Sequence, residues 1–440
     1  MLFFNYSLID ITPTENLFLG GYANRKGLST SIHRRLTSRC VVLKQKGVII
    51  CLIVNDLMDV YPEIIQSIKD RIVKKTSIDI DSILITSIHT HSAPEMEFGR
   101  SEANDSYIRS FIFQISDNAC KTIKDIKSFN KAALKYGKGK CDINIARRIV
   151  KPEGGGMAYR IGDPDGLRDE EVGILQLTNE TGSRKVTIFN YACHPVTLGY
   201  ESNYISTDYP GKAREIIEQK VGGMAVFLNG AAGDLSPREG NTIEPIVTDR
   251  VGEYLGNAAV SIKMTLFSDN PDIKTIAKTI WVPFRDQIIT KEHITREAKR
   301  KASDITEFYT WSEMLDRWKK KVYEMIDKNE VKTSFPFKIN VVKLGKVIIF
   351  FTQGELFVKY QLELKRLFPD YQIFCVAYVH GVGAYIPTED VFEKKGYEAD
   401  QSYIYEILPS PLSPQIEKIY LKGAINAIHE LLNGNTTGGY

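Results

Sequence analysis

The chain has 440 residues, of which 43% are hydrophobic and 25% are charged, a composition typical of a folded globular protein. Its formal net charge of +3 is small, so composition indicates neither a nucleic-acid footprint nor a patch for an anionic membrane surface. No uninterrupted apolar run reaches the length that a membrane span requires. The six cysteines are dispersed without a CxxC spacing, which favours free thiols in a reducing compartment.

The amino-terminal segment lacks a basic stretch followed by a long apolar core, so no signal peptide is expected. We therefore expect a cytoplasmic location, or a secreted one if the chain is a mature form. Residues 8–37 are polar and glycine-rich, which indicates a long loop. Two apolar runs around a Lys-Gly turn predict a β-hairpin at 39–56, and the spacing of isoleucines predicts a helix at 61–76.

The apolar run that begins at Ile83 predicts a buried strand, and His89 and His91 follow it. Residues i and i+2 of an extended chain point to the same side, so we expect both imidazoles on one face. Two such histidines can hold a metal ion, although ordinary hydrogen-bonded histidines at a strand end fit an isolated HxH pattern equally well.

In the rest of the chain, segments with the hydrophobic periodicity of helices alternate with segments typical of strands. Helices are predicted at 104–128, from STDYPG to about 220, at 243–265, from TQGE to about 367 and at 412–432; strands are predicted at 132–146, 173–178, 185–195, 224–230, 273–284, 337–352 (a hairpin) and 371–379. Residues 288–330 are highly charged, and we expect one or two long helices with a solvated face there. The alternation predicts an α/β protein with mixed β-sheets flanked by helices. We expect a single large catalytic domain at 1–433 and a flexible tail at 434–440.

Several common catalytic motifs are absent from the sequence. It contains no GxxxxGK, GxGxxG, HExxH or GxSxG pattern, which disfavours a nucleotide enzyme, a zincin and an α/β-hydrolase. Instead, polar clusters follow the ends of several predicted buried strands, which is where sites assemble in α/β folds. These clusters are His89/His91, NYACHP at 190–195, NGAAGDLSP at 229–237 and TQGE at 352–355.

His194 and Glu355 extend the histidine pair into a candidate metal site. Two or three histidines with one carboxylate form a natural zinc set that leaves a position for water. Each residue also has a structural interpretation, because His194 precedes a proline in a turn and Glu355 is placed to cap the helix that follows. We expect Asp234 to shape its own turn by accepting hydrogen bonds from backbone amides, and Ser236 to do likewise, although a nucleophilic serine must be considered.

Nine motifs also resemble, in the same order, those of the neutral/alkaline, non-lysosomal ceramidases. They are DITPT at 10–14, GGYANR at 20–25, IHTHSAP at 88–94, NYACHP at 190–195, STDYPG at 206–211, and then GAAGDLSP, TQGE, GAYIPT and GYEA up to residue 399. A run of nine ordered motifs is far more specific than any one of them.

The resemblance implies a fold, an activity and a zinc cofactor. Members of the family hydrolyse an N-acyl amide with one zinc ion, and a zinc-activated water attacks the amide carbonyl. By resemblance the zinc ligands here are His89, His194, Glu355 and Tyr385.

The resemblance also assigns groups around the zinc. His91 would face the reacting carbonyl and protonate the leaving amine, and Tyr397 would help to hold the oxyanion. The family's arginine matches Arg147, with Arg148 as a near alternative, and Ala146 replaces the asparagine that usually precedes it. Ser236 lies in the family's GDxSP turn, where we favour a structural role.

Two departures from the family bear on the substrate. The ceramidases carry an additional immunoglobulin-like domain, for which this chain ends too early, and they are usually secreted or membrane-facing. We therefore expect a soluble amidase that acts on a small-molecule or lipid N-acyl amide, in which a role in sphingolipid metabolism is implied but ceramide need not be the best substrate. The alternatives are a carbohydrate or small-molecule de-N-acetylase on the same site and a non-catalytic binding protein that retains the fold. No nucleic-acid partner is expected.

Overall fold

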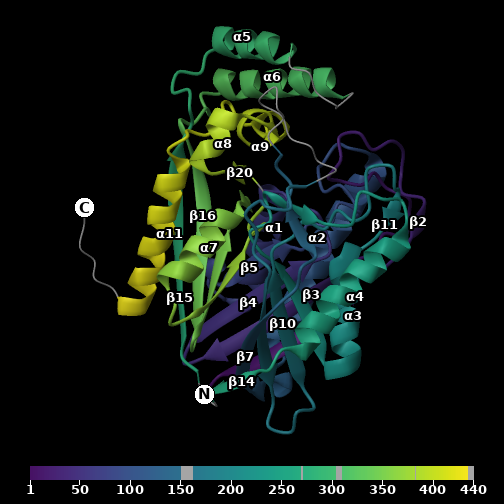
Figure 1. The fold of residues 1–440 in the computed structure, drawn as a ribbon, viewed down its shortest axis with the longest axis vertical. Coiled ribbons are helices and arrows are strands. Elements are labelled where there is room, and N and C mark those ends of the chain that lie inside the picture. Colours follow the sequence, from purple (N-terminus) through teal and green to yellow (C-terminus); the bar gives the residue numbers. More distant parts are fainter. Residues whose placement is uncertain (150–161, 269–270, 304–309, 382, 435–440) are drawn as a thin grey trace.

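The computed structural model describes residues 1–149, 162–268, 271–303, 310–381 and 383–434 (Figure 1). The predicted tail therefore lies outside the described residues from 435 onward. The predicted class is confirmed, because mixed β-sheets are flanked by helices along the whole chain. Within the described ranges, none of the helices combines the length and the apolar composition that crossing a membrane requires.

The described residues form three larger sheets that share one plan. In each, a first strand lies antiparallel to a second, the second forms a hairpin with a third, and a helix leads to a fourth strand parallel to the third. A parallel step needs such a crossover, because a tight turn cannot return the chain to the same end of the sheet. In each unit one more helix follows the fourth strand. The topology therefore repeats three times, although no internal repeat is visible in the sequence.

The first unit is coloured purple to blue in Figure 1. It consists of β1 (Phe3–Asp10), β3 (Thr37–Gln45), β4 (Val48–Asn55), α1 (Pro62–Thr76), β5 (Ile83–Ser87) and α2 (Glu102–Lys124), with β6 (Asn130–Lys131) beside β1 and short 3₁₀ turns at Ile80–Ser82 and Ile126–Ser128. The predicted hairpin and both predicted helices are therefore confirmed. The predicted loop at 8–37 is interrupted by the end of β1 and by β2 (Ser31–Ile32), which pairs with β11 (Tyr204–Ile205).

The second unit follows in teal, and it corrects one predicted strand. It consists of β7 (Ala133–Lys140), β9 (Glu171–Thr178), β10 (Lys185–Tyr191), α3 (Asp208–Val221), β12 (Met224–Asn229) and α4 (Pro245–Ser261), with β14 (Thr265–Ser268) beside β7. The single strand predicted at 132–146 is wrong, because the chain leaves the sheet after β7. It then forms β8 (Asn144–Ala146), which pairs with β13 (Leu235–Pro237) in the turn after β12.

The third unit runs from green to yellow. It consists of β15 (Ile273–Pro283), β16 (Ser334–Leu344), β17 (Val347–Thr352), α7 (Val358–Leu367), β19 (Gln372–Val376) and α11 (Ile416–Asn433). Between β15 and β16 lie α5 (Lys291–Lys301) and α6 (Trp311–Asp327), the two helices predicted for the charged segment. Between β19 and α11 lie β20 (Tyr385–Ile386), which pairs with β18 (Glu355–Leu356), and the short helices α8 (Glu389–Lys394), α9 (Tyr397–Asp400) and α10 (Ser402–Tyr405).

The three sheets pack against one another through their inner faces and are covered by helices on their outer faces. Successive strand residues alternate between the two faces. In β4, Leu52 and Val54 belong to the core that the three sheets share, whereas Cys51 and Ile53 pack against α1 and α2. The parallel strands β4, β5, β10, β12, β17 and β19 are therefore buried on both sides, which is why they read as nearly uninterrupted hydrophobic runs.

A buried ion pair joins the first two units. Asp56, directly after β4, accepts hydrogen bonds from both terminal nitrogens of Arg214 in α3, at 2.6 and 2.8 Å. Its Oδ2 also accepts from the amide and the hydroxyl of Thr37, at 2.7 Å each. The side chains of Asp56 and Arg214 are 0% and 2% exposed, so the carboxylate has no access to water.

We predict that Arg214→Met lowers the free energy of unfolding by about 3–5 kcal/mol, because it leaves Asp56 charged, buried and uncompensated. Urea unfolding followed by circular dichroism measures this change. Lys220→Met on the exposed side of the same helix is the control and should change the stability by less than about 0.5 kcal/mol. Equal stability of the two variants would contradict the prediction.

Candidate metal centre

The carboxyl ends of the parallel strand pairs from the three units meet at one place. The side-chain amide of Asn190, at the end of β10, donates to the carbonyls of Leu228 in β12 and Cys375 in β19, at 2.8 Å each. The amide of Asn229, at the end of β12, donates to the carbonyl of Ile88 after β5 at 3.1 Å. These bonds fix the segments that follow the strands, and those segments carry the predicted site residues.

His89 does not have the extended conformation that the sequence predicted. Strand β5 ends at Ser87, and His89 has a φ of +70°, in the left-handed region. Its Nδ1–H donates to the carbonyl of Met58 at 2.9 Å, which leaves the lone pair on Nε2. The ring of Tyr378 stacks on the imidazole with a centroid distance of 3.9 Å.

His91 nevertheless lies beside His89, as predicted, because the backbone turns rather than continuing the strand. The two Nε2 atoms are 3.3 Å apart. The imidazole packs edge-on against the ring of Tyr22, with centroids 4.8 Å apart. Gly21 approaches it so closely that a Cβ there would lie 2.5 Å from the ring, and Gly21 also has a φ of +98°. Residues of the GGYANR motif therefore form the surface against which His91 packs.

His194 completes a cluster of three imidazoles. Its Nδ1–H donates to the carbonyl of Ala232 at 2.6 Å, so its Nε2 also carries a lone pair. The ligand atoms of His89, His91 and His194 lie within 4.8 Å of one another. Burial lowers the pKa of His89 and of His194 to about 3, so both imidazoles are neutral near pH 7.

Glu355 adds a carboxylate to this cluster. Its Oε2 lies 3.1 Å from Nε2 of His194 and 3.6 Å from Nε2 of His89. Because both of these nitrogens carry lone pairs, three acceptor atoms face one another, and Oε2 accepts no hydrogen bond from the residues that the structure describes. Burial raises the pKa of Glu355, and the neighbouring His89 and Arg147 oppose that rise.

The donor set fits a zinc ion. Ligand distances of about 2.0–2.2 Å in a tetrahedral site place ligand atoms roughly 3.3–3.6 Å apart, close to the separations found here. Two neutral histidines and a carboxylate, all buried, are also the groups that zinc prefers, and a cation between them would remove the unfavourable contact of three lone pairs. The structure identifies a possible metal site at His89, His91 and His194.

Tyr385 is brought to Glu355 by the parallel pairing of β18 with β20. Its hydroxyl accepts a hydrogen bond from Nη2 of Arg147 at 3.2 Å. Nη1 of the same guanidinium lies 3.4 Å from Nε2 of His194. The ring of Tyr397 packs edge-on against that of Tyr385, with centroids 5.7 Å apart. Arg147 is thus placed against the imidazole cluster.

Two further residues at this site were not predicted from the sequence. Glu398 is fully buried and forms ion pairs with Arg147, at 3.0 Å, and with Arg148. Tyr378 stacks on His89 and lies next to Glu355. Sequence features could have indicated both residues. Glu398 lies inside the GYEA motif, and Tyr378 follows a buried strand as His89 and Glu355 do.

Asp234 and Ser236 lie at the edge of the site. Asp234 was predicted to shape its own turn, and its carboxyl does interact with its own backbone amide. Its Oδ1 also accepts from the amide of Val358 at 2.8 Å, at the start of α7. It therefore provides the cap that the sequence analysis considered for Glu355. Burial raises the pKa of Asp234 to about 7. Ser236 is the central residue of β13 and pairs with Ile145 of β8.

Two other loop histidines lie outside the cluster. His33 contacts Asp249, with Nε2 3.3 Å from its carboxylate. His380 contacts Asn340, with Nε2 2.7 Å from its side-chain oxygen. His380 also lines a cavity of about 880 Å³ between α1 and the paired strands β15 and β16, whose lining contains none of the predicted site residues.

Residues 6–337 match a protein family described as neutral/alkaline non-lysosomal ceramidase, N-terminal. The crystal structure of neutral ceramidase from Pseudomonas aeruginosa is similar with a TM-score of 0.67 and 16% identity, and the match covers 98% of this chain and 74% of that chain. A structure titled "Ceramidase complexed with C2" is similar with a TM-score of 0.69 and 15% identity, covering 100% of this chain and 76% of that one. At these identities the structural likeness shows a shared fold. Since the family match spans well over half of the residues, the chain belongs to the neutral/alkaline non-lysosomal ceramidase family, as its motifs predicted.

Proposed function

We propose that this chain is a zinc-dependent hydrolase that cleaves an N-acyl amide bond. The observation that carries the proposal is the cluster of His89, His194 and Glu355, whose Nε2 and Oε2 atoms face one another in a buried site. The pairing of Tyr385 with Glu355 supports Tyr385 as the fourth ligand of this proposed set. Zinc held there would act as a Lewis acid that polarises the substrate carbonyl, and it would lower the pKa of a bound water to about 7.

The groups around the cluster divide the remaining work. His91 packs against Tyr22 and Gly21 beside His89, and burial lowers its pKa, so its imidazole starts neutral. We assign it to face the reacting carbonyl, to take the proton that the attacking water gives up and to pass that proton to the leaving amine. Arg147 and Tyr397 are assigned to stabilise the oxyanion, because donors preorganised at a developing negative charge lower the barrier most. Glu398 supports this role by holding the guanidinium of Arg147.

We predict that the purified protein carries about one zinc ion per chain and that His89→Ala or His194→Ala loses it, because each removes one of the neutral imidazoles. Elemental analysis measures the content. His429→Ala is the control, since this residue is exposed on α11 and should leave the content unchanged. Full zinc occupancy in a His89→Ala/His194→Ala double variant would contradict the assignment.

We predict that Ser236→Ala keeps measurable turnover, whereas Glu355→Ala is near background. Ser236 is held in β13, and the proposed reaction needs no acyl-enzyme intermediate. Removing a catalytic serine costs on the order of 10⁶ in kcat, so the two mechanisms differ widely in the result. Steady-state assays of both variants make the comparison, and the opposite order of activities would indicate acyl-enzyme chemistry.

The substrate class is tested with a panel of N-acyl compounds, from acetylated sugars to long-chain ceramide in detergent. We expect release of free amine from a member of this panel, loss of that activity with a zinc chelator and its recovery on adding zinc. Release from no member, or activity that ignores the chelator, would contradict the proposal. The ratios of kcat/KM within the panel also test the expectation that ceramide need not be the best substrate, which a clear preference for long-chain ceramide would overturn. The cytoplasmic location stays a prediction.

A further inference from the structure

Helix α5 carries charged residues on the face that it buries. Its buried side chains are Ile294, Glu297 and Lys301, at positions i, i+3 and i+7 of one face. Lys301 is 0% exposed and Glu297 is 9% exposed. The expectation of a solvated charged face is therefore wrong for this side of the helix. A helix that needed this face only for packing would carry apolar residues at all three positions.

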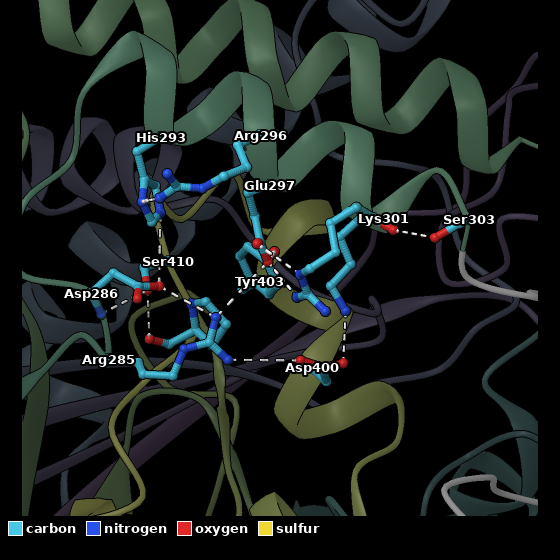
Figure 2. A network of polar contacts seen from close by, with 12 residues as sticks. Arg285, Asp286, His293, Arg296, Glu297, Lys301, Ser303, Asp400, Tyr403 and Ser410 are labelled. Atoms are coloured by element: carbon cyan, nitrogen blue, oxygen red, sulfur yellow. Dashed lines mark hydrogen bonds and ion pairs between the residues drawn. The ribbon is translucent and has the colours of Figure 1, made fainter.

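These buried charges contact the two short helices next to the site (Figure 2). The ammonium of Lys301 donates to Oδ2 of Asp400, the last residue of α9, at 2.7 Å. Oε1 of Glu297 accepts from the hydroxyl of Tyr403 in α10 at 3.0 Å. Arg285 lies 3.9 Å from each of the two carboxylates and bridges them. The network thus joins α5 to the segment of 397–405.

Lys301 is itself held in place by the second helix of the hairpin. The indole Nε1–H of Trp311, at the start of α6, donates to the carbonyl of Lys301 at 2.9 Å. The indole of Trp318 donates to the carbonyl of Leu408 at 2.6 Å, beyond α10. Both helices of the α5–α6 pair therefore contact residues between 400 and 408.

Helix α9 depends on such outside contacts. It has four residues, which is too short for a helix to be stable alone. Gly396 precedes it with a φ of +123°, a conformation that favours glycine. Its single turn places Tyr397 and Glu398 next to the site, whereas Asp400 faces Lys301.

From Glu398 the contacts continue into the imidazole cluster. Its carboxylate binds the guanidinium of Arg147 at 3.0 Å, and that guanidinium lies against His194 and donates to the hydroxyl of Tyr385. Two ion pairs and one turn of helix therefore connect Lys301 to a candidate metal ligand.

We propose that Lys301 is a positioning residue, which fixes α9 through Asp400 and so places Glu398 to hold Arg147 at the reacting group. A buried ion pair adds little net stability, but it defines geometry because a misplaced partner leaves a charge unpaired. The expected effect on kcat rests on the function proposed above, whereas the expected fixing of α9 by Lys301 does not.

The test compares Lys301→Met with Lys299→Met, an exposed lysine on the same helix. We expect Lys301→Met to lower kcat about 10–100-fold, as supporting residues around metal sites do, with KM and zinc content unchanged. If Lys301→Met does not fold, Lys301→Met/Asp400→Asn removes both charges together and should show the same loss of kcat. Lys299→Met should behave as the wild-type protein.

A double-mutant cycle separates positioning from general stability. If Lys301 acts through Glu398, Lys301→Met should cause no further loss of kcat in a Glu398→Gln background. The proposal would be overturned if the losses of kcat from Lys301→Met and Glu398→Gln multiply in the double variant. It would also be overturned if Lys301→Met lowers the melting temperature and leaves kcat unchanged.

Hydrogen–deuterium exchange gives an answer that does not need a substrate. Amides of residues 396–401 should exchange faster in Lys301→Met, or in Lys301→Met/Asp400→Asn, than in Lys299→Met. Equal exchange would overturn the inference. If the wild-type protein hydrolyses no N-acyl amide, the proposed function is contradicted. The exchange measurement then still decides whether Lys301 fixes α9.

Discussion

The structure depends on one constraint, that the parallel strand pairs of three sheets end at the same place. Two buried asparagines hold these ends together by donating to carbonyls of neighbouring strands, and a buried polar side chain of this kind is costly unless it is satisfied. Each unit then contributes a segment beyond its strand. His89 comes from the first unit, His194 from the second and Glu355 from the third, so the candidate metal centre lies where the units join.

Much of the fold and of the site could be predicted from the sequence. Buried strands that end in polar residues were visible as apolar runs, and they led directly to His89, His194 and Glu355. The shared topology of the units was not visible, because packing needs only apolar residues at alternating positions and leaves their identity free. The conformation of His89 was also missed, because its left-handed backbone depends on hydrogen bonds to the loop after β4, which lies far away in the sequence. Glu398 was missed because its importance appears only once Arg147 is placed beside it.

Burial explains the electrostatics of the centre. Taken away from water, an imidazole loses its proton more easily and a carboxylate holds its proton more strongly. The pKa shifts of His89, His194 and Glu355 follow these directions. Both imidazoles are therefore neutral, with unprotonated Nε2 atoms, and the described contacts place the guanidinium of Arg147 against His194. Such a site gains more from binding a divalent cation than an exposed cluster of the same residues would.

The convergence of three units also has a consequence for folding. The side chains of the centre come from positions between Tyr22 and Glu398, so the contacts among them close loops that span most of the chain. Contacts of such high sequence separation form late, because the entropy of closing the loops is lost before the contacts stabilise anything. Each unit can build its own hairpin and crossover helix from local contacts, yet none contains enough of the centre to bind a ligand. The centre therefore comes into existence only when the last unit has docked, and its formation marks the completion of the native state.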